Sequence, residues 1–148
     1  MDPQFGPPDP HDSYRLRPAV FGLALRDGRL ACVRVDRGEA GYFDLPGGAI
    51  DGAETEPQAL AREFAEETGL RIVATHRLGQ AGQRFRKSDG TAVNNVGGFW
   101  RVDILGQNPD AKCEDDHTLT WLDPDEALAA LRHEAHAWAV TLLLRSER

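Results

Sequence analysis

The chain has 148 residues, 41% of them hydrophobic, which is enough for one globular domain with a substantial buried core. Its formal net charge of −7 argues against a nucleic-acid backbone or an anionic membrane as the main partner, because both would repel an acidic chain. Cys32 and Cys113 lie far apart and lack metal-ligand spacing, and no stretch has the pattern of a signal peptide or a membrane span. We therefore expect a cytoplasmic protein with reduced, semi-buried cysteines.

The N-terminal half predicts an arm followed by strands. Residues 1–14 are rich in proline and aspartate and predict a flexible arm, after which residues 15–148 form a single domain. Residues 19–25 and 30–35 predict two strands joined by Asp27-Gly28, a strong hairpin signal. We expect a loop over residues 37–41 and a short extended segment over residues 42–45. Pro46-Gly47-Gly48 then predicts a sharp turn.

A helix is predicted between Thr55 and Gly69. Thr55 is a suitable N-cap, and Gln58 three residues later completes a capping box. Leu60 and Phe64 supply the apolar stripe that would face a core. Gly69 provides the left-handed residue with which such helices end.

The last turns of this helix carry an unusual cluster of acids. Glu63, Glu66 and Glu67 stand at i, i+3 and i+4, so a helix places their carboxylates on one face. Two of them lie at the negative end of the helix dipole, which disfavours each by about 0.3–1 kcal/mol. A bound Mg²⁺ or Mn²⁺ would reverse the sign of this argument, because such ions require hard oxygen ligands. A solvated acidic helix face is the alternative, and the cluster alone does not decide between them.

The C-terminal half predicts further strands and a helical region. Residues 71–86 and 93–105 predict a long antiparallel hairpin, with Asn94-Asn95 interrupting or bulging the second strand. Residues 117–122 predict a last strand with Trp121 in the core. Asp123 and Glu126 form a second capping box, which opens a helical region to about residue 145, broken near residues 133–136.

The spacing of the acidic segment has a close counterpart in a known family. Gly48, then Glu54, then the run from Arg62 to Leu70 resembles the Nudix hydrolase signature of MutT-like proteins at every fixed position. Phe64 is a mild departure, since the family usually carries Leu, Ile or Val there. The resemblance implies an α+β Nudix fold, an α/β/α sandwich with a mixed β-sheet between helices.

The resemblance also implies roles for individual residues. Mg²⁺ or Mn²⁺ would be bound by Glu63, Glu66, Glu67 and the carbonyl of Gly47, although the glycines at this turn can equally serve only the turn. Arg62 would orient the carboxylates, and Glu54 would fix the loop against the helix or bind metal through water. The general base would be Glu66 or Glu63. The alternatives for the base are loop carboxylates, namely Glu114, Asp115 and Asp116.

For several other groups of residues, the sequence allows both a functional and a structural interpretation. The segment Arg84-Phe85-Arg86-Lys87 is either a solvated hairpin tip or a phosphate- or base-binding patch. Asn95, with Asn94, could bind a base edge or only shape a bulge. Of Phe99 and Trp100, one is expected in the core and the other could line a pocket. His133-Glu134-Ala135-His136 lacks the second spacer of the zinc motif HExxH, so we expect a helix-surface pair.

The resemblance implies a metal-dependent hydrolase that cleaves the diphosphate linkage of a nucleoside diphosphate joined to another moiety and releases a nucleoside monophosphate. The substrate would be a small nucleotide, either a nucleoside triphosphate or a nucleotide-linked metabolite. The chain shows no SQPWPFPxS-like array of NADH pyrophosphatases, and it has Phe85 where ADP-ribose hydrolases tend to show proline. The alternative is a non-catalytic Nudix-fold nucleotide sensor or binding module, although all four glutamates of the signature are present. A homodimer is possible.

Overall fold

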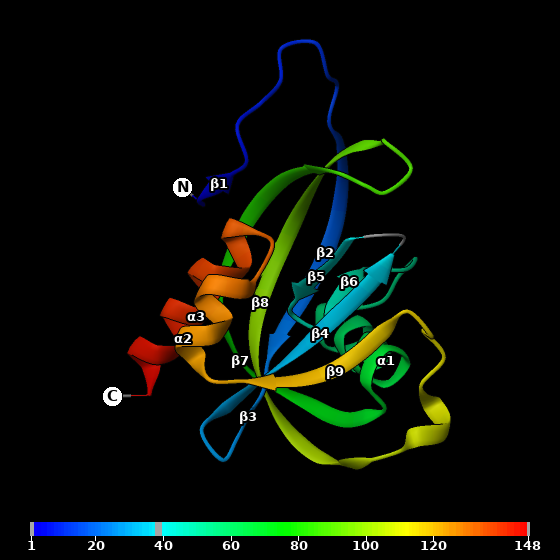
Figure 1. Cartoon of the computed structure of the whole chain (residues 1–148), viewed down its shortest axis with the longest axis vertical. Helices are drawn as coiled ribbons and strands as arrows, with labels where there is room; N and C mark the ends of the chain where they lie inside the picture. Colours follow the sequence, from blue (N-terminus) through cyan, green and yellow to red (C-terminus); the bar gives the residue numbers. More distant parts are fainter. Residues whose placement is uncertain (1, 38–39, 148) are drawn as a thin grey trace.

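The computed structural model of the chain describes residues 2–37 and 40–147 (Figure 1). The elements, in chain order, are β1 (Gln4–Phe5), β2 (Arg15–Leu23), β3 (Leu25–Arg26), β4 (Arg29–Arg37), β5 (Ala40–Asp44), β6 (Gly47–Ala49), α1 (Glu56–Thr68), β7 (Leu70–Arg86), β8 (Ala92–Gln107), the short 3₁₀ helix η1 (Pro109–Ala111), β9 (His117–Leu122), α2 (Pro124–Ala130) and α3 (Glu134–Ser146).

The strands form two sheets. The first has the order β1-β7-β8-β2-β6, and it is mixed because β2 runs parallel to β8 and β1 runs parallel to β7, whereas its other pairs are antiparallel. In the second sheet β4 is central and pairs with β3, β5 and β9. The long hairpin predicted from residues 71–86 and 93–105 is present as β7 and β8.

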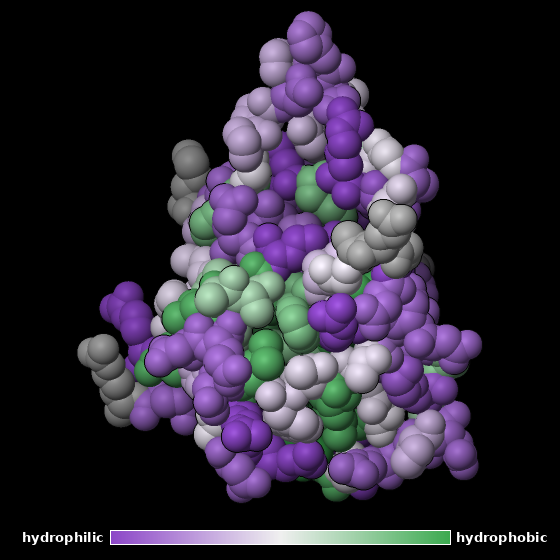
Figure 2. Space-filling view, viewed as in Figure 1, coloured by the Kyte–Doolittle hydropathy of each residue, from purple (hydrophilic) through white to green (hydrophobic). Residues whose placement is uncertain are grey.

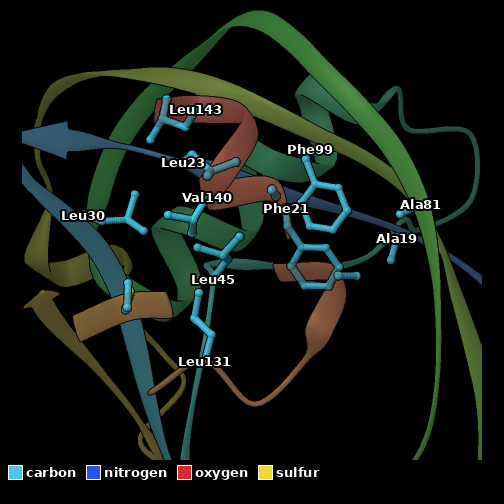
Figure 3. Close-up of a cluster of buried hydrophobic side chains, with 14 residues drawn as sticks. Ala19, Phe21, Leu23, Leu30, Leu45, Ala81, Phe99, Leu131, Val140 and Leu143 are labelled. Carbon is cyan, nitrogen blue, oxygen red and sulfur yellow. The ribbon is translucent and has the colours of Figure 1, made fainter. Parts of the chain in front are cut away.

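Two hydrophobic clusters lie on opposite faces of the first sheet, because side chains alternate along a strand. Ala19, Phe21 and Leu23 of β2 belong to the cluster under α2 and α3, which Figure 3 shows. Val20 of the same strand belongs to the cluster under α1, together with Ala24 beyond its end. Figure 1 shows α1 on one side of the molecule and α2 with α3 on the other. The predicted α+β fold, with a mixed sheet between helices, is confirmed.

The chain changes sheets just after β2, which the sequence did not predict. The expected strand over residues 19–25 divides into β2 in the first sheet and β3 in the second. The predicted hairpin at Asp27-Gly28 does form, with φ values of 53° and 77° at these residues. This hairpin joins β3 to β4, so the strand that pairs with β4 there is the short β3 and not the whole expected strand over residues 19–25.

Two other local predictions were wrong. Arg37 and Ala40, expected in a loop, are paired residues of β4 and β5, while residues 38 and 39 of that predicted loop lie outside the described part. Asn94 and Asn95 pair regularly with Arg84 and Gln83, so they do not form a bulge. The shifts of register fall elsewhere in the hairpin, between Arg71 and Gly79.

Helix α1 begins and ends as predicted. Thr55 caps it with both hydrogen bonds of the capping box to Gln58, and Gly69 ends it with φ 74°. Phe64 is fully buried, and its ring lies against Gly22, where a Cβ atom would approach Phe64 Cε2 to 2.5 Å. The aromatic residue at this position of the Nudix-like segment is therefore accommodated by a glycine on β2.

The expected surface pair of histidines is buried, so this prediction was wrong. His133 lies in the gap between α2 and α3, and His136 lies in the first turn of α3; their exposed fractions are 5% and 1%. His136 Nδ1 accepts a hydrogen bond from the backbone N–H of Leu45 at 3.1 Å. His136 therefore joins the C-terminal helix to the loop that precedes β6.

The two cysteines also differ from expectation, while one of the two aromatic residues on β8 lies in the core as expected. Cys32 is fully buried and Cys113 is exposed, so neither is semi-buried. Phe99 is in the core as expected, whereas Trp100 is half-buried and donates its Nε1–H to Glu56 at 2.8 Å. Trp121 packs against the cluster under α1 while remaining partly exposed.

The N-terminal segment contacts the domain at several points. Gln4 and Phe5 pair with β7, and the ring of Phe5 lies 5.9 Å from that of Trp138 on α3. Flexibility of the remaining arm stays a prediction. Figure 2 shows that hydrophobic side chains gather near α2 and α3 on the viewed face, while its upper end is mostly hydrophilic. Within the described ranges, no helix has the length and apolar character needed to cross a membrane.

Candidate active site

A cavity of about 240 Å³ is lined by residues from both sheets, from α1 and from the segments next to β9 and α3. Its acidic side chains are Asp44, Glu63, Glu67 and Glu114, and its basic ones are Arg17, Arg37, Lys87 and Arg132. The remaining lining residues are Phe21, Val35, Tyr42, Gly47, Gly48, Phe85, Ser88, Asn95, His117 and His133. A site of mixed charge in a cavity of this kind suits a phosphorylated small molecule bound together with cations.

The turn at Gly47-Gly48 packs directly against α1. Gly47 has φ 146°, and a Cβ atom there would lie 2.2 Å from the carbonyl oxygen of Val20, so this position requires glycine. A Cβ atom at Gly48 would lie 3.0 Å from the Glu63 carboxylate. The N–H of Gly47 donates to Glu67 Oε1 at 3.0 Å. The two glycines therefore let α1 place two carboxylates against the backbone of β6.

Arg62 fixes the carboxylates around it and does not line the cavity. Its Nε and Nη2 donate to both oxygens of Glu54 at 2.8 and 2.9 Å, and its Nη1 donates to Glu63 at 3.1 Å and to Glu66 at 3.3 Å. Nη2 also donates to the carbonyl oxygen of Ala49. Arg62 thereby connects the loop before α1, the end of β6 and two glutamates of the helix.

The two inward-facing glutamates are held in a buried, acidic environment. Burial is the largest cause that raises the pKa of Glu63 to about 7, with opposition from the charge of Arg62. Burial likewise raises the pKa of Glu67 well above its ordinary value, and the charges of Glu63, Asp44 and Glu114 act in the same direction. Close, buried carboxylates are costly without a cation, and hard oxygen donors are the ligands that Mg²⁺ or Mn²⁺ prefers. The donor set therefore fits a divalent ion.

The segment 113–117 lies next to the glutamates of α1 and adds further acidic side chains to this side of the cavity. The carbonyl oxygen of Glu66, at the end of α1, accepts hydrogen bonds from the backbone N–H groups of Cys113 and Glu114 at 2.9 and 3.1 Å. His117 then lies with its Nε2 3.5 Å from Glu67 Oε2 and its Nδ1 2.7 Å from Asp116 Oδ1. Glu114, Asp116 and His117 offer ligand atoms within 4.8 Å of one another, a further group that could hold a metal ion.

Two of the basic side chains are paired with acids. Arg132 binds Asp44 through two hydrogen bonds at 3.2 and 2.8 Å, and Arg37 donates to Asp116 Oδ2 at 3.0 Å. The guanidinium of Arg132 also lies 3.6 Å from the ring centroid of Tyr42 and 5.3 Å from that of Phe85. This end of the cavity therefore combines aromatic faces with cations, a combination that suits nucleotide binding.

The structure brings some of the predicted site residues together and leaves others outside. Gly47, Glu63, Glu67, Glu114, Phe85 and Asn95 line the cavity. Glu54, Arg62 and Glu66 form the supporting network just described, and Asp115 is exposed. Arg84 donates to the carbonyl oxygen of Gly6, and Arg86 binds Asp12 and the carbonyl oxygen of Gly90. These two arginines join the hairpin to the N-terminal arm and do not line the cavity.

Sequence reasoning missed Arg17, Arg37, Asp44, His117 and Arg132. None of them belongs to a motif, because each reaches the cavity through strand pairing or loop packing between segments far apart in the chain. His117 directly follows the candidate loop carboxylates Glu114, Asp115 and Asp116, and this proximity in sequence is the one signal that could have indicated it.

Residues 15–144 match the sequence model of the NUDIX domain. The chain belongs to the Nudix family. A Mycobacterium tuberculosis protein provisionally named 8-oxo-dGTP diphosphatase 2 is 40% identical to this Nudix chain over 89 residues, which cover 59% of the chain and 57% of that relative. A MutT-like protein of Streptomyces ambofaciens is 30% identical over 126 residues, covering 84% of the chain and 73% of that protein.

Solved structures agree on the fold. A NUDIX hydrolase from Nitrosomonas europaea superposes with a TM-score of 0.75 at 21% identity, covering 90% of the Nudix chain and 92% of its own. The chain spans only 57% of the length of the Mycobacterium relative. Nudix hydrolases generally need a divalent metal ion, and the glutamates that line the cavity of this Nudix domain provide donors suited to one.

Proposed function

We propose that this Nudix domain is a metal-dependent pyrophosphohydrolase that cleaves the diphosphate linkage of a nucleoside diphosphate joined to another moiety. The products are a nucleoside monophosphate and a second phosphorylated fragment. One observation carries the proposal: Glu67, which is buried, and Glu63, which is partly buried, both have raised pKa values and line the same cavity beside the backbone of Gly47. The diphosphatase name of the Mycobacterium relative supports the class of reaction.

Glu63, Glu67 and the carbonyl of Gly47 are the groups that would hold Mg²⁺ or Mn²⁺, with Glu66 and Glu114 next to them. When bound, such an ion neutralises phosphate oxygens and lowers the pKa of a coordinated water. Arg62 keeps Glu63 oriented through its hydrogen bond, and the N–H of Gly47 and His117 Nε2 hold the two oxygens of Glu67.

Glu63 is the helix glutamate we favour as general base. Of the two helix glutamates considered for this role, Glu63 is the one that lines the cavity. Glu66 lies outside the cavity lining and its carboxylate binds Arg62. Glu114 is the one of the three loop candidates that lines the cavity, and it remains the alternative base.

The test is hydrolysis of a panel of nucleoside triphosphates, nucleotide sugars and dinucleotides with Mg²⁺, by the natural chain and by Glu63→Gln and Glu67→Gln. We expect nucleoside monophosphate from at least one substrate, and a fall in turnover of about 100-fold or more in each variant, because each removes an oxygen donor of the centre. Undiminished hydrolysis in both variants would contradict the proposal. Tight nucleotide binding without any turnover would instead indicate a sensor.

A further inference from the structure

A row of three polar side chains crosses the first sheet at the edge of the cavity. Arg17 on β2 is paired with Asn95 on β8, and Asn95 is paired with Gln83 on β7. Paired residues on neighbouring strands point to the same face, so the three side chains share one side of the sheet. Gln83 Oε1 accepts a hydrogen bond from the backbone N–H of Ala135 and so holds α3. Arg17 and Asn95 line the cavity.

Arg17 differs from the paired arginines of the cavity. Within residues 2–37 and 40–147, no carboxylate lies within 4.0 Å of its guanidinium, whereas Arg37 and Arg132 each bind an aspartate. Its Nη1 donates to the neutral amide oxygen of Asn95 at 3.0 Å. Arg17 is half-buried, and burial lowers its pKa, yet a guanidinium stays charged at neutral pH.

The surroundings of Arg17 select the kind of group that it can bind. A guanidinium presents five N–H donors and no acceptor. The hydrogen bond to buried Asn95 uses one of these donors and helps to orient the group, so the others remain available for a ligand. A half-buried cation without a counter-ion is poorly solvated, so an anion is the ligand that relieves this most. Arg17 lines the same cavity as Glu63 and Glu67, so this cation lies near the acids of the proposed reaction centre.

We propose that Arg17, positioned by Asn95, binds an anionic group of the substrate that lies beyond the diphosphate linkage being cleaved. This inference rests on the proposed function and narrows its substrate class. Nucleoside triphosphates carry such a group, whereas nucleotides linked to a neutral sugar do not. Lys87, which lines the same cavity and whose Nζ lies 4.0 Å from Asp89, adds positive charge for the same ligand.

Asn95→Asp separates a binding role of Arg17 from a structural one. An aspartate of nearly the same shape would give Arg17 a permanent counter-ion inside the protein. A structural role of Arg17 would then be kept or strengthened, whereas its ability to bind an anionic group of the substrate would be lost. Gln83→Glu is the matched control. It makes the same change of charge one strand away, at a residue that does not line the cavity.

The experiment compares kcat/KM for the nucleoside triphosphate that turns over fastest with kcat/KM for the diphosphate sugar of the same base. We expect Arg17→Gln and Asn95→Asp to lower the value for the triphosphate by about 10- to 100-fold, the range for a hydrogen bond to a charged group. The value for the sugar nucleotide should change less than about 3-fold, because it has no group for Arg17. Arg17→Lys should recover part of the loss, and Gln83→Glu should leave the ratio of the two values unchanged.

A second readout does not need turnover. Calorimetry with an α,β-methylene nucleoside triphosphate and Mg²⁺ should show the same 10- to 100-fold weakening in Arg17→Gln and Asn95→Asp. If the natural chain hydrolyses nothing, the proposed function fails, and the binding data still test Arg17. Equal losses for the triphosphate and the sugar nucleotide, or unchanged binding of the methylene analogue in folded Arg17→Gln, would overturn the inference.

Discussion

The carboxylate of Glu67 is held between a backbone N–H and an imidazole. Gly47 donates to one oxygen at 3.0 Å, and His117 Nε2 lies 3.5 Å from the other. His117 is in turn oriented by Asp116, which Arg37 binds. Such outer partners fix the direction of a ligand and contribute to metal affinity without touching the metal.

We therefore predict that His117→Ala weakens binding of Mn²⁺ by about 10- to 100-fold, the range for loss of an outer-shell partner. Glu67 would retain its carboxylate but lose one of the groups that orient it. Calorimetric titration of the purified protein with Mn²⁺ measures the effect. His76→Ala, at an exposed position on β7, is the control and should bind the ion like the natural chain. An unchanged dissociation constant in His117→Ala would show that His117 has no such role.

At the scale of elements, the decisive contact is that of α1 with β6. The helix can approach because Gly48 leaves room for the Glu63 carboxylate, whose carbon atom would lie 3.0 Å from a Cβ atom there. A Cβ atom at Gly47 would instead meet backbone atoms of β2, so a side chain at this position would disturb the sheet itself.

Gly48→Ala should therefore impair the site more than the fold. The added methyl group would displace the flexible end of Glu63 by a few tenths of an ångström. Since a misplacement of about 1 Å at a reacting group can cost about 100-fold in rate, we expect kcat to fall by about 3- to 10-fold while the melting temperature changes by only a few degrees. Gly106→Ala is the control, because its Cβ atom would meet only Arg71 side-chain atoms at 3.4 Å or beyond. A Gly48→Ala variant with full activity would show that Glu63 does not need its observed position.

For the whole molecule, the buried acids link stability to pH and to metal. The pKa of Glu63 is raised to about 7 by burial, so the unfolded chain releases this proton at lower pH than the folded chain does. Between about pH 4.5 and pH 7 the folded state therefore binds more protons, and its stability should fall as the pH rises. Divalent ions should offset this loss, because they bind the ionised carboxylates of the folded state.

We predict that the metal-free protein loses about 1–3 kcal/mol of unfolding free energy from this group between pH 5 and pH 8. Urea unfolding at both pH values, with EDTA or with millimolar Mg²⁺, measures the loss. In Glu63→Gln the difference in unfolding free energy between pH 5 and pH 8 should be smaller by that amount. In the natural chain, Mg²⁺ should restore the unfolding free energy at pH 8. The same pH dependence in both proteins, or no effect of Mg²⁺, would argue against an ionisable, metal-binding Glu63.

Much of the fold could be predicted from local patterns, and the exceptions have a common cause. Thr55, Gln58 and Gly69 delimited α1 because caps depend on neighbouring residues alone. The change of sheet after β2 and the burial of His133 were missed, because each is decided by which distant surface the segment meets. Periodicity does not report such choices.

The sequence by itself determined the family, the helix with its three clustered glutamates and the nature of the metal that would suit them, because the spacing of residues on one helix is a local property. Tertiary structure alone decided that Glu63 and Glu67 face the cavity while Glu66 lies aside. It also brought His117 to Glu67, and Arg17 to Asn95 across 78 residues of chain. Those contacts arise from the packing of α1 on β6 and from the register of parallel strands, which are long-range relations that no short stretch of sequence encodes.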